Sequence, residues 1–218
     1  MRELKLENIC YQYKNAGRMA LENINCAFRP GTVSAVVGPS GSGKTTLLSI
    51  MAGLDRPSGG RVLLGEADLA GMDLDAYRRK DVSVIFQAFQ LFPLLTVLEN
   101  VCYPMELGGV PVKAARERAG ALLESVGIEA EKFHRFPANL SGGEQQRVAI
   151  ARSLATGAGV LLADEPTGNL DGENSRNVVE LLTRLAHEEG YCVVIVTHDP
   201  AVAEASDLVY RMVDGALQ

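Results

Sequence analysis

The chain has 218 residues, of which 47% are hydrophobic and 22% charged, and its formal net charge is −6. This length allows one large domain with a substantial core, and the acidic balance argues against a broad basic surface for nucleic acid. Because no apolar run approaches the roughly 18 to 20 residues that cross a bilayer, we expect any role at a membrane to require a separate membrane-spanning partner.

The first third of the chain predicts strands and one helix. Polar and apolar residues alternate along Leu4–Tyr13 and Leu21–Phe28, which predicts two strands of an antiparallel sheet. The apolar run Thr32–Val37 predicts a buried strand, and a glycine-rich loop separates it from a helix over Lys44–Ala52. A further strand is expected at Arg61–Leu64. The centre of this region is therefore a strand–loop–helix unit.

Helix and strand patterns alternate in the rest of the chain. Val82–Phe86 predicts a strand, and helical patterns dominate from Val97 to Ala155. Strand patterns return at Val160–Ala163 and Cys192–Thr197, separated by an amphipathic helix over Asn174–Glu188. This order predicts an α/β fold with a parallel, doubly wound core, into which the helix-rich middle is inserted as a lobe.

The cysteines show no metal-ligand spacing, and the N-terminus shows no secretory signal. They are Cys10, Cys26, Cys102 and Cys192. We expect them to be small buried hydrophobic residues in a reducing compartment, with no zinc site and no disulfide framework.

The glycine-rich loop carries a phosphate-binding pattern. Residues 38–45 read Gly-Pro-Ser-Gly-Ser-Gly-Lys-Thr, which matches G-x-x-x-x-G-K-[ST] between a strand and a helix. Glycines let backbone N–H groups approach phosphates, and the helix N-terminus adds the positive end of a dipole. Lys44 would contact the β- and γ-phosphates, and the Thr45 hydroxyl would bind Mg²⁺. The residues expected to contact the nucleotide here are Gly38, Ser40, Gly41, Ser42, Gly43, Lys44, Thr45 and Thr46.

Two acidic residues end a later apolar strand. Asp164 and Glu165 directly follow Val160–Ala163. Since ligands of α/β sheets bind beyond the carboxyl ends of the strands, Asp164 would lie beside the Mg²⁺ that accompanies the nucleotide. The adjacent Glu165 would polarise an attacking water. Together with the phosphate loop, these acids predict nucleotide hydrolysis.

A third motif precedes the acidic strand. Leu140–Gln145 reads Leu-Ser-Gly-Gly-Glu-Gln. With the phosphate loop and the acidic strand in this order, the sequence resembles the ATP-binding cassette (ABC) ATPases over nearly its whole length. The resemblance implies a P-loop NTPase core with a parallel sheet, an antiparallel β subdomain and an inserted α-helical subdomain.

The resemblance also implies how the chain is divided and paired. We expect one domain, in which residues 1–87 and 160–218 form the nucleotide-binding core and residues 88–159 form a helical lobe that carries the signature motif. In the family this motif engages the γ-phosphate of ATP held by an opposing subunit, so two cassettes pack head to tail. The residues that would make this contact from the start of the signature helix are Ser141, Gly142 and Gly143.

Other residues match the family's motifs one by one. Gln87 stands at the junction of core and lobe, where the family's glutamine contacts Mg²⁺ or the attacking water. His198 matches the switch histidine that contacts the γ-phosphate, and Asp171 ends the D-loop that links the two sites of the dimer. Tyr13 is expected to stack on adenine, with Tyr11 as the alternative.

Two segments resemble one subgroup of the family. Phe86–Asn100 and Ala163–Asp171 are similar to cassettes that serve lipoprotein release, export of macrolides or antimicrobial peptides, and bacterial cell division. Gln90 and Phe92 depart from the Asn and Leu that are common in this subgroup. The apolar loop Leu91–Leu94 either faces a membrane partner or packs inside the lobe.

We therefore expect an ATP- and Mg²⁺-dependent ATPase that works as a homodimer and energises a separate permease, on the cytoplasmic face of the cell membrane. Lipoprotein, peptide or macrolide-like cargo is expected from the resemblance.

The alternatives are a cassette that regulates a membrane complex without transport, a soluble ABC ATPase of DNA repair, and a nucleotide-binding scaffold. The sequence shows none of the long coiled-coil insertions or zinc modules of the DNA-repair class, and no nucleic acid partner is expected. The complete catalytic set argues against the scaffold.

Overall fold

The structure is a computed structural model that describes residues 1–14 and 17–218. Apolar runs of strand length assemble its six-stranded central sheet, in which β10 is antiparallel to β9 and the other strands are parallel. In spatial order the strands are β10 (Ala216–Leu217), β9 (Leu208–Val213), β3 (Thr32–Val37), β8 (Cys192–Thr197), β7 (Val160–Asp164) and β6 (Val82–Phe86). The sheet confirms the predicted parallel core.

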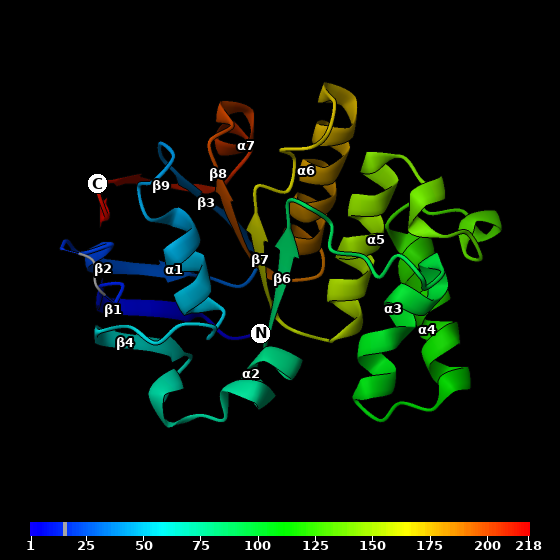
Figure 1. The fold of residues 1–218 in the computed structure, drawn as a ribbon, viewed down its shortest axis with the longest axis horizontal. Coiled ribbons are helices and arrows are strands. Elements are labelled where there is room, and N and C mark those ends of the chain that lie inside the picture. The colour runs from blue at the N-terminus through cyan, green and yellow to red at the C-terminus, as the bar shows by residue number, and fades with distance from the viewer. Residues whose placement is uncertain (15–16) are drawn as a thin grey trace.

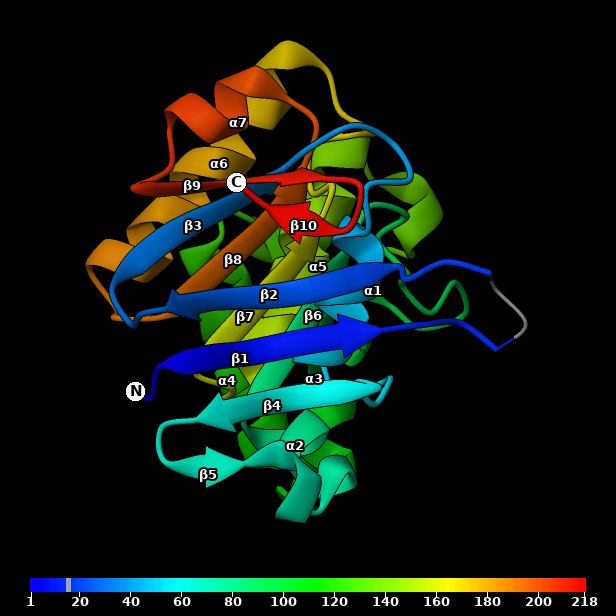
Figure 2. The same cartoon turned by 90° about the vertical axis from the view of Figure 1, so that its left-hand side faces the viewer.

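A four-stranded antiparallel sheet lies beside the central sheet, and its strands run across the front of the molecule in Figure 2. Its strands are β2 (Leu21–Phe28), β1 (Leu4–Tyr11), β4 (Gly59–Leu64) and β5 (Ala67–Asp68). The prediction of a strand as far as Tyr13 was too long. Tyr11 is the last residue of β1 that pairs, opposite Leu21, although the alternating pattern continues beyond it.

Helices cover both faces of the central sheet. Helices α3, α4 and α5 pack on one another as the predicted helical lobe, to the right in Figure 1. The α-helices are α1 (Lys44–Met51), α2 (Leu74–Lys80), α3 (Val97–Leu107), α4 (Val112–Ser125), α5 (Gly142–Ala155), α6 (Gly172–His187) and α7 (Pro200–Glu204). The short 3-10 helices are η1 (Leu69–Gly71), η2 (Ala130–Lys132) and η3 (Pro137–Asn139).

Alternate residues of the central strands belong to two separate hydrophobic clusters. Leu162 and Val194 pack with α1 and the antiparallel sheet, whereas Leu161 and Val193 pack with α6 and the helical lobe. This division follows from the two-residue period of a strand, whose successive side chains point to opposite faces. Because both faces are covered, β8 is buried along its whole length and reads as a continuous apolar run.

The sequence patterns did not predict α2, α7, β5, β9 or β10, which are short or partly exposed. The expectation that all cysteines are buried was wrong for Cys10 and Cys26, which are partly exposed on the antiparallel sheet, while Cys102 and Cys192 are buried. In the part of the chain that the structure describes, no helix combines the length and hydropathy that would let it traverse a bilayer.

Candidate functional site

The loop between β3 and α1 is wrapped around the side chain of Lys44. Its Nζ donates hydrogen bonds to the carbonyl oxygens of Gly38 (2.8 Å) and Pro39 (3.0 Å), and the residue is 8% exposed. Gly43 caps α1 with a φ of 106°, and a Cβ at this position would lie 2.8 Å from the carbonyl oxygen of Ala20. The loop therefore requires glycine here, both for its left-handed backbone and for its close packing.

A pocket of about 990 Å³ lies over this loop and extends along the carboxyl ends of β7 and β8. The sequence-predicted residues that line it are Tyr13, Ser40, Gly41, Gly43, Lys44, Thr45, Thr46, Gln87, Asp164, Glu165 and His198. Gly38 contributes its carbonyl oxygen to Lys44, and the Ser42 side chain is buried without lining the pocket. The structure thus brings together the phosphate loop, both acids, the glutamine and the histidine.

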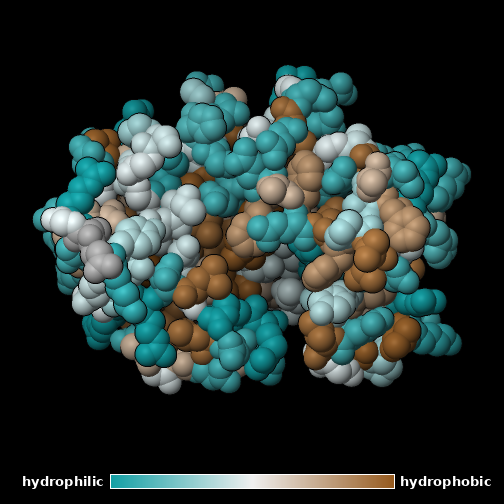
Figure 3. All heavy atoms as spheres, viewed as in Figure 1, coloured by the Kyte–Doolittle hydropathy of each residue, from teal (hydrophilic) through white to brown (hydrophobic). Residues whose placement is uncertain are grey.

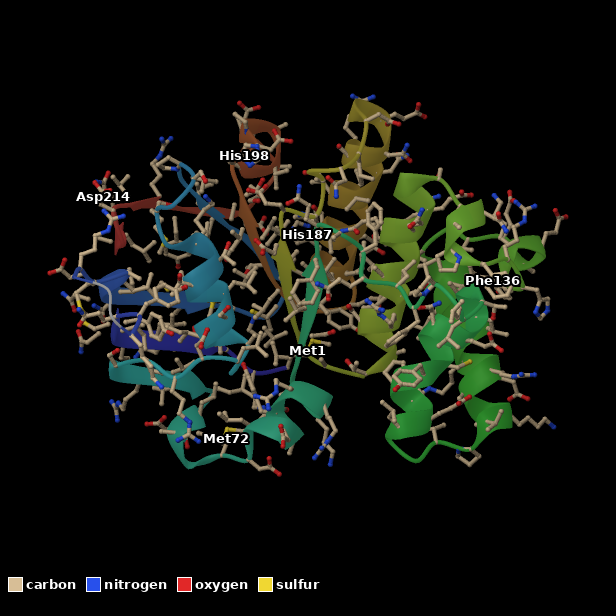
Figure 4. The ribbon with its side chains drawn as sticks, viewed as in Figure 1. Met1, Met72, Phe136, His187, His198 and Asp214 are labelled. Carbon is tan, nitrogen blue, oxygen red and sulfur yellow. The ribbon has the colours of Figure 1, made fainter. Side chains whose placement is uncertain are left out.

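The two acids at the end of β7 differ in their surroundings. The Asp164 carboxylate accepts no hydrogen bond within the part of the chain that the structure describes. Burial, together with the adjacent carboxylate of Glu165, raises its pKa, although Lys44 opposes this. Glu165 has a φ of 46°, and its Oε2 accepts from the Thr197 hydroxyl at 2.9 Å. Its Oε1 lies 2.7 Å from Nδ1 of His198, which Figure 4 shows on the side of the molecule where β8 ends. Glu165 is therefore held by β8, whereas Asp164 has room for a ligand.

Gln87 lies at the end of β6, where the chain leaves the core for the helical lobe. Its side-chain nitrogen lies 3.4 Å from Oδ1 of Asn169, and Nδ2 of Asn169 donates to the Gln87 carbonyl oxygen at 2.9 Å. A Cβ on Gly168 would meet the Gln87 amide nitrogen at 2.6 Å. The junction and the loop before α6 are consequently packed directly against each other.

Arg152 fixes the next residues of the junction, a contact that sequence reasoning missed. It donates to the carbonyl oxygens of Phe89 (3.0 Å) and Gln90 (2.6 Å). Both acceptor residues have positive φ, 57° and 49°, which is unfavourable for residues other than glycine. The guanidinium therefore stabilises a strained turn next to Gln87.

Tyr13 lines the pocket, whereas Tyr11 does not. The Tyr13 hydroxyl lies 2.7 Å from Oγ1 of Thr46, and the two tyrosine rings meet edge to face with centroids 4.9 Å apart. The ring of Tyr13 is thus fixed beside the phosphate loop, which leaves it as the candidate for stacking on a base.

The signature residues are not part of this pocket. Ser141 caps α5, because its Oγ accepts from the Glu144 backbone N–H at 3.3 Å. Asp171 caps α6 in the same way through the Asn174 N–H at 2.9 Å. Figure 1 shows the N-terminal ends of α5 and α6 on the side where β7 and β8 end. One face therefore carries the pocket and, separately, the signature.

Residues 21–168 match the family model described as ABC transporter. The chain belongs to this family. As an ABC cassette it binds and hydrolyses ATP, in keeping with the phosphate loop, acids, glutamine and histidine that line the pocket.

Individual relatives show which ABC proteins this cassette resembles. It is 42% identical to the lipoprotein-releasing system ATP-binding protein LolD 1 of Rhodopirellula baltica, over 98% of this chain and 95% of that protein. It is 41% identical to the macrolide export ATP-binding/permease protein MacB of Brucella melitensis, of which it spans 34%. The dimeric structure of the cassette MJ0796 in a post-hydrolysis state, bound to ADP and Pi, matches with a TM-score of 0.88 and 38% identity, over 99% of this chain and 96% of that chain. This likeness confirms the predicted fold, including the antiparallel and helical subdomains of an ABC cassette.

Several residues that line the pocket were not predicted from the sequence. They are Arg18, Met19, Ala20, Glu22, Pro39, Val196, Asp214 and Gly215. The turn between β9 and β10 reaches the pocket because the Gly215 N–H donates to the Ser42 carbonyl oxygen at 2.9 Å. The dipeptide Asp214–Gly215 is a common hairpin turn, so it could have revealed β9 and β10. It could not have revealed their contact with the phosphate loop.

Proposed function

We propose that the cassette is the ATP-hydrolysing subunit of a membrane transporter and acts as a head-to-tail dimer. The observation that carries this proposal is the separation of the site: the pocket holds the phosphate loop and the acids, and the signature lies outside it on the same face. A second copy, turned by half a rotation, would bring its signature onto the ATP of the first. The dimeric state of the related cassette supports this arrangement.

Each residue of the pocket has a proposed role. Lys44 moves from the loop carbonyls to the β- and γ-phosphates, and Tyr13 stacks on adenine. Glu165 takes a proton from the attacking water, and His198 contacts the γ-phosphate. The signature residues of the partner cassette bind the same phosphate through their hydroxyl and N–H groups, and Asp171 connects the two sites through the N-terminus of α6.

The site also fits a Mg²⁺ ion that shares its ligands with ATP. Thr45, Gln87 and Asp164 offer hard oxygen atoms along one pocket, and Asp164 is a carboxylate without a hydrogen-bond donor among the described residues. Those residues include no group of three or more His, Cys, Asp or Glu side chains suited to hold a metal alone, so phosphate oxygens would complete the ligand set. The ion would supply positive charge to the phosphate oxygens.

A permease would dock on the helical lobe. Leu91 packs against the core of the lobe, but Phe92 is exposed and Leu94 is 87% exposed. Phe92 contacts the ring of Tyr103 on α3, and hydrophobic atoms are visible on this lobe at the right of Figure 3. The loop therefore has two parts: Leu91 anchors it to the core of the lobe, and Phe92 and Leu94 offer an apolar surface to a partner. The permease would hold the cassette on the cytoplasmic face of the membrane.

The proposed cargo is a lipoprotein, a peptide or a macrolide-like compound. Relatives that release lipoproteins or export macrolides are about 40% identical to this chain, and in the macrolide exporter the permease is part of the same polypeptide. The test is to purify the protein, alone and after co-expression with permease genes that neighbour its own. We expect Mg²⁺-dependent phosphate release, an ATP-induced dimer, and co-purification of a permease with a large extracytoplasmic domain. ATPase activity that depends on DNA, with no membrane partner, would contradict the proposal.

Replacing Gly143 with alanine is expected to lower ATP turnover by about a hundredfold, because the change displaces the signature from its productive position. The new Cβ would lie 2.1 Å from Oδ1 of Asn174, and Nδ2 of Asn174 is bonded to the Asp171 carboxylate at 2.9 Å. Asn174 cannot move aside without losing this bond. Phosphate release at saturating ATP measures the effect.

Gly142→Ala is the matched control, because its Cβ would make an ordinary contact, 3.5 Å from a methyl carbon of Leu170. Its loss of activity is expected to be clearly smaller. The double variant Gly143→Ala/Asn174→Ala removes the amide atoms that would lie 2.1 and 2.5 Å from the new Cβ and leaves the Cβ of residue 174 at 2.9 Å, so it should recover part of the lost turnover. Equal activity of the two single variants would show that the contact with Asn174 is unimportant.

A further inference from the structure

The signature helix begins with a reciprocal cap that uses a carboxylate. The Ser141 N–H donates to Oε2 of Glu144 at 2.7 Å, while the Glu144 N–H donates to the Ser141 hydroxyl oxygen. No acceptor for the N–H groups of Gly142 and Gly143 is found in the described part of the chain. The cap therefore satisfies its own two donors and leaves the two glycine amides without an acceptor, with Gly142 partly exposed and Gly143 buried.

The second oxygen of the same carboxylate is bound by a lysine from another segment. Nζ of Lys132, at the end of η2, lies 2.9 Å from Oε1 of Glu144, and it also lies 3.0 Å from Oε2 of Glu129. The side chains of Lys132 and Glu144 are 24% and 17% exposed, whereas that of Glu129 is 71% exposed. Lys132 is thus a partly buried partner of Glu144, and its contact with Glu129 is open to solvent.

The charge of Glu144 is present at every physiological pH. Burial raises the pKa of its carboxyl group, but the hydrogen bonds from Lys132 and Ser141 outweigh this and lower the pKa to about 2. A full negative charge therefore lies in the first turn of the helix that is proposed to bind a phosphate. Unless it is offset, this charge repels the phosphate and competes with it for the positive end of the helix dipole.

We propose that Lys132 is a positioning residue of the signature site, which neutralises Glu144 and fixes its carboxylate so that the site accepts the γ-phosphate of the opposing cassette. The inference rests on the proposed head-to-tail function. Lys132 does not cap the helix itself. It acts through Glu144, whose carboxylate it shares with the backbone of Ser141.

The contact between Lys132 and Glu144 can be removed without unfolding the helical lobe. The segment after η2 is held by its own backbone bonds to α3, from the Val97 N–H to the Arg135 carbonyl oxygen (2.9 Å) and from the Leu98 N–H to the Phe133 carbonyl oxygen (3.0 Å). The bond between Ser141 and Glu144 also stays available when Lys132 is replaced. A Lys132→Gln variant should therefore fold, and its urea unfolding midpoint is measured to establish this.

The experiment compares ATP hydrolysis by the full-length wild type and five variants: Lys132→Gln, Lys132→Arg, Glu144→Gln, Lys132→Gln/Glu144→Gln and Glu129→Gln. Lys132→Gln is expected to raise the ATP concentration for half-maximal turnover by about five- to tenfold, because it leaves the Glu144 carboxylate uncompensated in the first turn of the helix that is proposed to bind the phosphate. The maximal rate of turnover should change less than this half-maximal concentration. The effect should shrink in 0.5 M NaCl, and Lys132→Arg should retain most of the wild-type value.

The variants of Glu144 distinguish charge compensation from a structural role. When Glu144 is already glutamine, Lys132→Gln should have almost no further effect, since no carboxylate remains to be neutralised. Glu129→Gln is the matched control: it removes the exposed partner of Lys132 and should leave the half-maximal concentration within about twofold of wild type.

Two results would overturn the inference while leaving the proposed function intact. One is an unchanged half-maximal ATP concentration in Lys132→Gln. The other is an equal loss in Lys132→Gln whether or not Glu144 is present, which would assign Lys132 a purely structural role. Absence of ATP turnover and of an ATP-induced dimer in the wild type would instead overturn the proposed function, and this inference with it.

Discussion

The Glu165→Gln variant is expected to bind ATP and dimerise, yet to turn over at least about a hundredfold more slowly than wild type. The carboxylate is the proposed acceptor of the proton that the attacking water loses, and an amide cannot accept it. The fold should survive, because an amide oxygen can still accept from the Thr197 hydroxyl, which now lies 2.9 Å from Oε2. The Glu165 N–H also keeps its bond to the Val196 carbonyl oxygen at 2.8 Å.

Two measurements on this variant separate binding from chemistry. Phosphate release gives turnover, and light scattering after size-exclusion chromatography gives the dimer fraction with ATP, which should exceed that of wild type because hydrolysis no longer reopens the dimer. Glu188→Gln, an exposed change at the end of α6, is the control and should resemble wild type in both assays. Turnover at the wild-type rate in Glu165→Gln would remove this residue from the mechanism.

The sequence predicted the elements that carry the phosphate loop and the acids because each is locally encoded. The run Thr32–Val37 is apolar over strand length, the glycines mark the tight loop, and Asp164 follows directly on a buried strand. The capping of α5 by Ser141 is local as well. Features that depend on three or four neighbouring residues were therefore accessible without a structure.

Features that depend on the meeting of distant segments were not accessible. The turn at Gly215 reaches the phosphate loop only because β9 pairs with β3, and Glu22 enters the same pocket because its N–H donates to the Gly215 carbonyl oxygen at 2.8 Å. The pair of Lys132 and Glu144 depends on the path of the chain through η3. In such cases the sequence shows the residues, but only the fold shows which of them meet.

Replacement of Lys44 is expected to remove ATP binding rather than to slow the chemistry. Lys44 is the cation that the loop encloses, and without phosphate its ammonium group is held by two loop carbonyl oxygens, those of Gly38 and Pro39. Binding of ATP exchanges these neutral acceptors for charged phosphate oxygens, which form stronger hydrogen bonds. Lys44→Met keeps the length of the aliphatic chain and deletes the charge, so it should weaken ATP binding by at least about a hundredfold, or about 2.8 kcal/mol.

Calorimetric or fluorescent titration with ATP measures this loss directly, and it should be accompanied by loss of the ATP-induced dimer. This outcome differs from that of Glu165→Gln, which keeps the dimer and loses turnover, so the pair of variants separates phosphate binding from water activation.

Lys113→Ala removes an exposed lysine of α4 and is expected to leave ATP affinity unchanged. Because Lys44 is buried in its loop, the urea midpoint of Lys44→Met must be close to that of wild type for the loss to be assigned to the phosphate contact. If such a folded variant bound ATP as tightly as wild type, the backbone N–H groups and the dipole of α1 would suffice to hold the phosphates, and the lysine would serve only to close the empty loop.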